Sequence, residues 1–410
     1  MLWWFLRPVL GNTADRLWAC ALVGLSGGIE GFLRPFVAQL PAALNPARID
    51  QSTWAPFGWN TFASLYNPLW IAGLTLTLVI LRPVLDPAGP RNRRDLLLIG
   101  IGFLLLYWVH PYSAIAVLAV VVARPIFEWV FEGAVRWTKL WRTASALLPS
   151  LLLALIVGRW QAQDAVYRAA SGNIFGTLQL PVFWYPLTLG AVGVVALRGA
   201  QRWIRQSHPY GVALLAWIGA IIVLHTSPII NGYHFLFQLH LPLCILGAAV
   251  VREVAGRLRD TRPAPRLAAA GLLFLVFASF VFVTVDSVRD IRLRNFVPAS
   301  YPRVIETLAT RPPGNALVPP TLGTMLPAFT PHRVWVGHWF LTPDYSSRVN
   351  RYEALTTDPD LFDQLTQLLR DQQIRYLVIP AERSDALLEA LGDRVDEHLR
   401  LGTMDLLVLR

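Results

Sequence analysis

The chain has 410 residues, of which 54% are hydrophobic and only 15% are charged. Soluble domains usually carry about 25% charged residues, and disordered chains contain few hydrophobic ones. The composition therefore excludes both an ordinary soluble globule and a disordered protein. The net charge of +10 would suit a nucleic-acid partner, so its distribution along the chain decides how it is interpreted.

Long apolar runs dominate the first 286 residues. We predict nine candidate membrane spans, at residues 15–33, 66–85, 95–109, 112–131, 144–160, 182–198, 211–228, 235–251 and 267–286. His110 and Pro111 interrupt the third and fourth runs, which are either two short spans or one broken helix. The charged, tryptophan-rich segment from Arg124 to Arg142 also fits a helix along the membrane interface.

Basic residues are concentrated in alternate loops between these spans. Residues 1–286 hold 22 of the 36 basic and 11 of the 26 acidic residues, for a net charge of +11, whereas residues 287–410 carry −1. By the positive-inside rule the basic loops face the cytoplasm. This predicts an N-terminus inside and residues 287–410 outside. The charge thus reflects membrane topology, and no nucleic-acid partner is expected.

Residues 287–410 show short apolar strands that alternate with helical patterns. Strands are predicted at 316–318, 333–336, 376–379 and 406–409, and helices at 321–326, 359–372 and 384–391. Such alternation predicts a small α/β fold. The predicted architecture is therefore a polytopic α-helical membrane domain, residues 1–286, followed by a small extracytoplasmic α/β domain, residues 287–410.

Familiar catalytic and cofactor motifs are absent from the sequence. It contains no P-loop, no dinucleotide-binding glycine motif, no HExxH, no GxSxG and no EF-hand loop. Both cysteines, Cys20 and Cys244, lie in predicted spans, and we interpret them as small buried apolar residues. No cofactor is indicated, no metal ligands are assigned, and a divalent metal is left open.

Polar groups near the predicted outer face are the candidate site residues, because such groups are costly inside a membrane. Asp50 lies in an external loop with Trp59 and Asn60, and an acid among aromatic rings suits a sugar-binding cleft. The same loop fits an interfacial aromatic belt. His110 and Tyr112 lie at an outer turn, where a histidine either binds phosphate or caps a broken helix.

Two further groups complete the candidates. Asn231 and His234 precede the eighth span, where they either line a substrate site or form an interfacial polar belt. His338, Trp339 and Asp344 directly follow a predicted strand, a usual place for a site in α/β folds. A membrane-facing loop held by Trp339 explains this last group equally well.

Several sequence blocks resemble a known family. The blocks are ALVPPTLGTMLPAFTPHRVWVGHWFLTPDY in the tail, FASLYNPLW, HPYSAIAVL, YHFLFQLHLPLCILGA and IRYLVIPAER. Through them the chain resembles bacterial GT-C glycosyltransferases related to dolichyl-phosphate-mannose protein mannosyltransferase and ArnT-like enzymes. The resemblance covers residues 50–410. It implies a polyprenyl-phosphate-linked sugar donor, an inverting transfer to an envelope glycan or protein on the outer face, and a bacterial cytoplasmic (inner) membrane location.

The family places a catalytic acid in its first external loop. The resemblance implies that this chain begins later than the family does and lacks the N-terminal part. Asp50 is therefore the catalytic candidate, although it does not map onto the catalytic acid of the family. Two alternatives stay open. One is a non-catalytic membrane scaffold or partner subunit of the same fold. The other is a lipid or solute transporter, for which the sequence shows no internal repeat.

Overall fold

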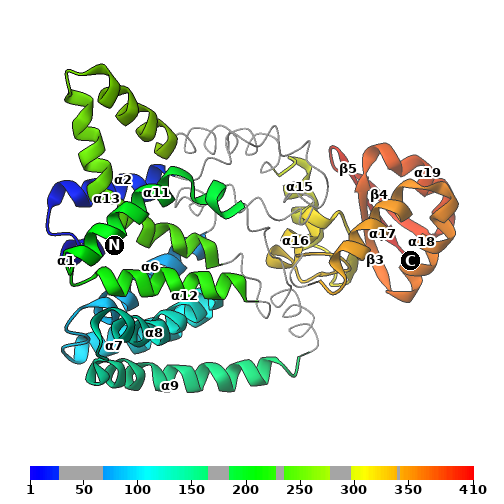
Figure 1. The fold of residues 1–410 in the computed structure, drawn as a ribbon. Coiled ribbons are helices and arrows are strands. Elements are labelled where there is room, and N and C mark those ends of the chain that lie inside the picture. Colours follow the sequence, from blue (N-terminus) through cyan, green and yellow to red (C-terminus); the bar gives the residue numbers. More distant parts are fainter. Residues whose placement is uncertain (27–67, 165–183, 228–234, 278–296, 339–341) are drawn as a thin grey trace. The chain divides into compact units, whose positions relative to one another are not determined.

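The structure is a computed structural model of the chain, and it describes residues 1–26, 68–164, 184–227, 235–277, 297–338 and 342–410. The chain forms two compact units (Figure 1). The helical unit comprises Met1–Arg159 and Phe175–Arg289, and the C-terminal unit comprises Trp160–Ile174 and Asp290–Arg410.

Apart from α1 (Leu2–Val9), which was not predicted, the helices of the helical unit follow the predicted apolar runs. They are α2 (Thr13–Leu25), α6 (Pro68–Leu85), α7 (Arg93–Val109), α8 (Pro111–Glu132), α9 (Trp137–Gln161), α11 (Trp184–Arg205), α12 (Gly211–Thr226) and α13 (Leu236–Gly256), with the short η3 (Arg257–Arg259) after α13. A further apolar helix is Pro263–Phe277. The predicted runs 15–33 and 267–286 extend beyond the described residues.

Three stretches within the described ranges are long and apolar enough to cross a membrane. They are Pro111–Glu132, Trp137–Gln161 and Gln238–Arg259. Ile71–Leu85, Gly211–Thr226 and Pro263–Phe277 are apolar but shorter. The number of nine spans and their orientation therefore stay predictions.

The interruption at His110 separates two helices. The chain leaves helical geometry at His110 (φ −153°, ψ 82°), and α8 begins with Pro111, whose missing N–H costs nothing at a helix start. The first turn of α8 lies against Gly73 near the start of α6. Its last turns reach the loop after α6, where Arg124 donates to the carbonyl of Asp86. Thus α8 runs alongside α6, and the two predicted runs form two helices that meet at His110, whereas the number of spans stays a prediction.

The segment from Arg124 to Arg142 is the end of one helix and the start of the next. Arg124 and Glu128 are buried in the last turns of α8. The chain then turns at Gly133, which adopts a left-handed conformation (φ 71°) that suits glycine, and α9 begins at Trp137. The segment is therefore not a single helix, and its position along a membrane interface stays a prediction.

The loops that were predicted to be basic meet at one end of the helical unit. Arg136 and Arg142, around the start of α9, donate to the carbonyls of Pro87 and Pro90 in the loop between α6 and α7. The turns after α6, α8 and α11 lie at the same side of the unit in Figure 1. We call this the basic end. His110 lies at the other end of α6, α7 and α8.

The C-terminal unit is built on a five-stranded mixed sheet in the order β2-β1-β3-β5-β4. The strands are β1 (Asn315–Leu317), β2 (Arg333–Val334), β3 (Ile374–Pro380), β4 (Val395–Arg400) and β5 (Met404–Leu409). β1 is parallel to β2 and β3, whereas β5 is antiparallel to β3 and β4.

Helices cover both faces of this sheet. They are α15 (Ser300–Ala309), α16 (Pro320–Phe329), α17 (Tyr345–Thr357), α18 (Phe362–Asp371) and α19 (Ser384–Leu391), with 3-10 turns at Pro359–Leu361, Ala381–Arg383 and Gly392–Arg394. In β3, Leu377 and Ile379 join the core beneath α17, α18 and α19, and Tyr376 and Val378 join the core with α15 and α16. Because both faces of β3 and β5 are buried, these strands carry the continuous apolar runs 376–379 and 406–409.

The predicted α/β architecture of the tail is confirmed, and some of its details are wrong. Four of the strands match prediction, but β2 is shorter. The helix predicted at 321–326 is longer, since α16 begins at Pro320 and runs on to Phe329. The helix predicted at 384–391 matches α19. The helices α15 and α17 and the strand β4 were not predicted.

Asp405 is fully buried on β5, and its charge is balanced by β4. Arg400 lies opposite it in the ladder and donates two hydrogen bonds of 3.1 Å, and His398 lies 2.9 Å away. Burial alone would raise the pKa of Asp405, but the hydrogen bonds from Arg400 and His398 outweigh it, so the pKa lies below its ordinary value. The ionised carboxylate thus stabilises the fold.

We expect this stabilisation to disappear in acid. A carboxylate with a lowered pKa in the folded state contributes stability above its unfolded pKa, about 4, and loses that contribution as the pH falls through the folded value. Asp405→Asn should cost about 1–3 kcal/mol at neutral pH, seen as faster amide exchange in β4 and β5. The exposed pair Glu353–Arg383 provides the control Glu353→Gln. Equal exchange in Asp405→Asn and wild type at pH 7 would contradict this role.

Candidate functional site

A buried polar cluster lies where α7 ends and α8 begins. His110 Nδ1 lies 2.8 Å from Ser113 Oγ, and Gln238 Nε2 from the first turns of α13 donates to the same hydroxyl at 2.6 Å. The three side chains, which we call the histidine cluster, are at most 6% exposed. Within the described residues, Gln238 Oε1 is buried without a hydrogen-bond partner.

Local sequence places His110 at this position. Its N–H donates to Leu106 at the end of α7, and its Nδ1 accepts the N–H of Ser113 at 3.3 Å, so it caps both helices. Gly73 permits the close approach of α6, because a Cβ there would lie 2.9 Å from the Cβ of His110. Helix capping, one of the two predicted roles, is therefore confirmed for His110.

Aromatic rings adjoin the cluster. The ring of Tyr112 lies 6.0 Å from that of His110 and 5.9 Å from that of Phe235, the latter edge-on. Phe235 directly precedes α13. The structure therefore brings the predicted residues His110 and Tyr112 next to the start of the eighth predicted span, where Asn231 and His234 were expected to contribute.

A second buried polar group lies two residues further along α13, at His240. His240 Nε2 is 3.1 Å from Ser26 Oγ at the end of α2 and 3.3 Å from Cys244 Sγ. All three side chains are at most 5% exposed. Cys244 is thus a buried residue with polar contacts, and neither described cysteine forms a disulfide. Ser26 and His240 extend the polar groups at the end of the unit opposite the basic end.

The remaining predicted site residues are separated from this cluster or not described. Asp50, Trp59, Asn60, Asn231, His234 and Trp339 lie outside the described residues. His338 and Asp344 are exposed in the C-terminal unit. Asp344 has a left-handed backbone (φ 52°) and precedes α17 without capping it through its side chain.

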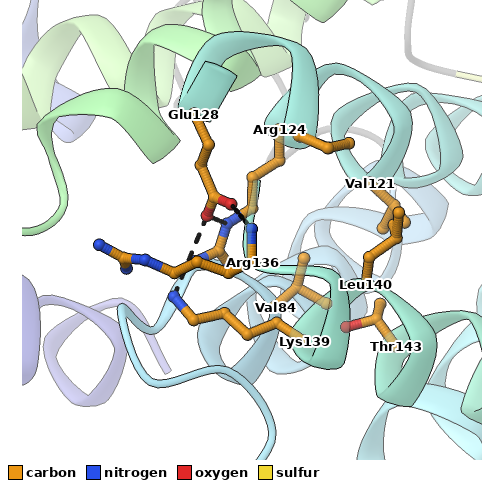
Figure 2. Close-up of a pocket in the computed structure, with 9 residues that line it drawn as sticks. Val84, Val121, Arg124, Glu128, Arg136, Lys139, Leu140 and Thr143 are labelled. Carbon is orange, nitrogen blue, oxygen red and sulfur yellow. Dashed lines mark hydrogen bonds and ion pairs between the residues drawn. The ribbon is translucent and has the colours of Figure 1, made fainter. Parts of the chain in front are cut away.

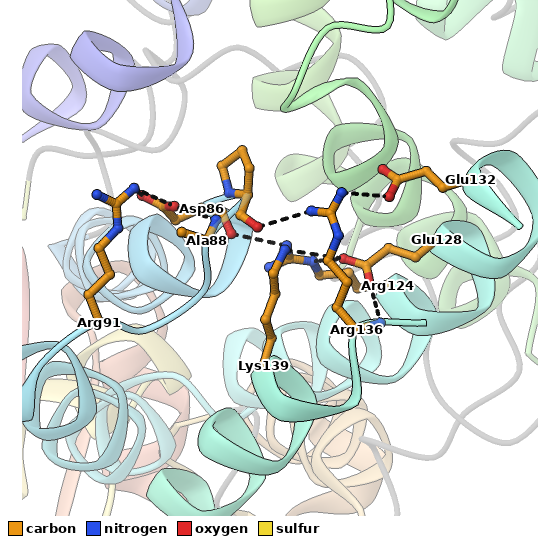
Figure 3. A network of polar contacts seen from close by, with 9 residues as sticks. Asp86, Ala88, Arg91, Arg124, Glu128, Glu132, Arg136 and Lys139 are labelled. Atoms are coloured by element: carbon orange, nitrogen blue, oxygen red, sulfur yellow. Dashed lines mark hydrogen bonds and ion pairs between the residues drawn. The ribbon is translucent and has the colours of Figure 1, made fainter. Parts of the chain in front are cut away.

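The basic end carries a denser charged network that links α8 and α9 to the loop after α6. Arg124 donates to Glu128 at 2.9 Å, and Lys139 Nζ lies 4.0 Å from the same carboxylate (Figure 2). Arg136 donates to Glu132 and to the carbonyl of Pro87 (Figure 3). Arg124, Glu128 and Lys139 line a hollow of about 20 Å³, which is the size of one water molecule. This network therefore suits a structural clamp rather than a substrate site.

Metal ligands do not gather within the described part of the chain, where no group of three or more His, Cys, Asp or Glu side chains could hold an ion. The histidine cluster offers instead neutral donors and acceptors and one imidazole. Such groups can bind a phosphate oxygen and orient it, and an imidazole can exchange a proton with it.

Comparison with known proteins gives no family. No protein-family model and no curated protein matches the chain. Two structures of an oligosaccharyltransferase from Archaeoglobus fulgidus are similar over 97% of this chain. The form tethered by a disulfide to an acceptor peptide containing the NVT sequon has a TM-score of 0.41 and 12% identity, and the apo form has 0.37 and 13%.

This chain spans only 59% and 60% of those two structures. At such TM-scores and identities, the similarity assigns neither a fold nor a function. The residues of this chain must therefore support any functional proposal by themselves.

Sequence reasoning found part of the histidine cluster. His110 was a candidate, but Ser113 was not, because no local sequence signal singles out a serine at this position. The charged clamp was also missed. Its signal is the spacing of Arg124 and Glu128, four apart within an apolar run, which places them on one helix face.

Proposed function

We propose that the chain is a membrane glycosyltransferase that moves a sugar from a polyprenyl-phosphate donor to a cell-envelope acceptor. One observation carries the proposal: Gln238 donates to Ser113 at 2.6 Å. This contact joins two sequence blocks, HPYSAIAVL and YHFLFQLHLPLCILGA, that carry the resemblance to GT-C enzymes. Polar side chains buried in an apolar helical unit are costly and are usually retained for function.

The proposed reaction is a single displacement. A hydroxyl oxygen of the acceptor attacks the anomeric carbon, and the bond from that carbon to the phosphate oxygen breaks. The electron pair leaves with the polyprenyl phosphate, and a carboxylate takes the hydroxyl proton as general base. Asp50 is the proposed base, and its placement lies outside the described residues.

The histidine cluster is proposed to hold the departing phosphate. The imidazole of His110 is proposed to donate through Nε2, because its Nδ1 accepts from Ser113, and Gln238 fixes the position of the Ser113 hydroxyl. Preorganised donors of this kind typically contribute about 10²-fold to rate. His234 is a second proposed phosphate ligand. The proposed location is the bacterial cytoplasmic membrane, with the transfer and the C-terminal unit on its outer side.

The test separates phosphate binding from helix capping at His110. Asparagine is a favoured helix N-cap, so His110→Asn keeps the cap and removes the imidazole. We expect His110→Asn to lower transfer of labelled sugar from a panel of undecaprenyl-phosphate hexoses, in nanodiscs, by about 100-fold. His208 provides a matched control, because its Nδ1 accepts the N–H of Tyr210 at the basic end. His208→Asn should retain transfer.

The opposite results are equally informative. If wild type transfers sugar and His110→Asn transfers it at the same rate, His110 is only a cap and the site is elsewhere. If no member of the panel is a donor for the wild-type protein, the proposed activity is wrong. The scaffold alternative predicts that the folded wild-type protein uses no member of the panel as a donor.

A further inference from the structure

A large hollow in the C-terminal unit is surrounded by arginine side chains. It has a volume of about 710 Å³ and lies at one end of the sheet. Because β5 is antiparallel to both neighbours, the starts of β3 and β4 meet the end of β5 there, as the pairs Tyr376–Val408 and Val395–Leu409 show. The end of α18 closes the same side. We call this hollow the arginine pocket.

The charge of the arginine pocket contrasts with that of its unit. Four arginines line it, Arg370, Arg375, Arg394 and Arg410, together with a single acid, Asp396. Yet residues 287–410 as a whole carry a net charge of −1. Elsewhere in the unit, Arg311, Arg383 and Arg400 form ion pairs with acids. Other arginines of the unit are exposed without a partner among the described residues, so what distinguishes these four is that they line one hollow together.

Three of the four guanidinium groups have no protein acceptor. Within the described residues, the side chains of Arg370, Arg375 and Arg394 form neither a hydrogen bond nor an ion pair, and Arg375 lies over the Tyr376 ring. Arg410 pairs with Asp396 at 3.3 Å, and both side chains of that pair are at least 60% exposed. Donors are thus available on several sides of one hollow.

The floor of the arginine pocket is apolar. Ile374, Leu391 and Val408 line it and are each at most 7% exposed. The volume lies within the range of small-molecule sites, about 300–1,000 Å³. Guanidinium forks suit carboxylate and phosphate oxygens, and an apolar floor suits the CH faces of sugar rings.

We propose that the arginine pocket binds an acidic glycan through its carboxylate or phosphate groups. We assign this glycan to the envelope acceptor that receives the sugar, and this assignment rests on the proposed function. The pocket itself is argued only from the C-terminal unit, so binding to it can be measured independently of any donor.

The experiment measures glycan binding to the full-length protein in nanodiscs at about 50 mM salt. The probe is hexagalacturonate, and its methyl ester is the neutral control glycan. We expect the acid to bind and the ester to bind at least about tenfold more weakly. The triple variant Arg370→Gln, Arg375→Gln, Arg394→Gln should lose at least tenfold in affinity for the acid, since hydrogen bonds to charged groups are the strong ones.

A matched variant controls for net charge. Arg303, Arg333 and Arg351 are exposed arginines of the same unit whose side chains also lack a partner among the described residues. Changing these three to Gln removes the same charge and should leave binding unchanged. Equal losses in both triple variants, or equal binding of acid and ester, would overturn the proposal. Equal or tighter binding of hexaglutamate would overturn the assignment to a glycan.

Two readouts keep the outcomes distinct. Amide exchange in β3 and β5 reports folding, and if the triple variant loses protection, the single variants Arg375→Gln and Arg394→Gln provide the test. Binding of undecaprenyl-phosphate hexose is measured on the same samples. If the triple variant loses glycan binding but keeps donor binding, the result bears on the arginine pocket and not on the proposed transfer. Glycan binding without donor binding contradicts the proposed function and leaves the pocket supported.

Discussion

Replacing Glu128 by Gln is expected to destabilise the helical unit by about 3 kcal/mol, because breaking a buried ion pair leaves uncompensated charge. The Glu128 side chain is 6% exposed, and it faces Arg124, which is 10% exposed, and Lys139, which is 14% exposed. It also accepts the N–H of Arg136 at 3.3 Å. The neutral amide would leave two cations buried without their carboxylate. Thermal unfolding in detergent and amide exchange in α8 and α9 measure the loss.

Glu132 is the matched control for this prediction. It lies one helical turn further along α8 and pairs with Arg136 at 2.9 Å, but their side chains are 32% and 45% exposed. Glu132→Gln should therefore cost less than about 1 kcal/mol. Adding Lys139→Met to Glu128→Gln should restore part of the stability by removing one unmatched cation. A Glu128→Gln protein as stable as Glu132→Gln would contradict the clamp.

Replacing Gly199 by Ala is expected to separate α11 from α13 and to destabilise the helical unit by about 3 kcal/mol or more. A Cβ on Gly199 would overlap the carbonyl oxygen of Leu246, which is backbone and has no rotamer to adopt. Gly247 on α13 is close as well, since a Cβ there would lie 2.9 Å from Val195 Cγ2. Small residues let helix backbones approach closely, as is also known for helix pairs in membranes.

Gly24 provides a control of opposite sign. It lies within α2, and a Cβ there would meet no atom within 4 Å. Because alanine favours helices over glycine, Gly24→Ala should stabilise the protein by about 0.5–1 kcal/mol. Unfolding in detergent distinguishes the two variants. A Gly199→Ala protein as stable as Gly24→Ala would show that α11 and α13 do not pack at these glycines.

The sequence predicted the helices and the central strands well, for a physical reason. Long apolar runs, such as that of α9, admit few structures other than a helix. The runs of β3 and β5 are apolar on both faces because helices cover both sides of the sheet. The missed strand β4 is different. It lies at the edge of the sheet and alternates half-buried with exposed residues, so it offers no apolar run.

The candidate site was harder to predict, because its residues come from distant parts of the chain. His110 was recognisable by its position in an apolar stretch, but nothing local pairs Ser113 with Gln238, 125 positions later. Similarly, the arginines of the arginine pocket look like ordinary surface residues until antiparallel pairing brings the ends of three strands together. Long-range contacts of this kind depend on tertiary packing, which residue spacing does not encode.

Photocrosslinking of the donor tests the central claim most directly. The probe is a polyprenyl-phosphate hexose with a diazirine on the isoprene unit next to the phosphate, bound to the full-length protein in nanodiscs. The account predicts saturable labelling, mapped by peptide mass spectrometry, at the start of α8 around Ser113 and at the start of α13 around Gln238. Labelling should fall when unlabelled donor is added. Labelling confined to the basic end around Lys139, or no saturable labelling, would contradict it.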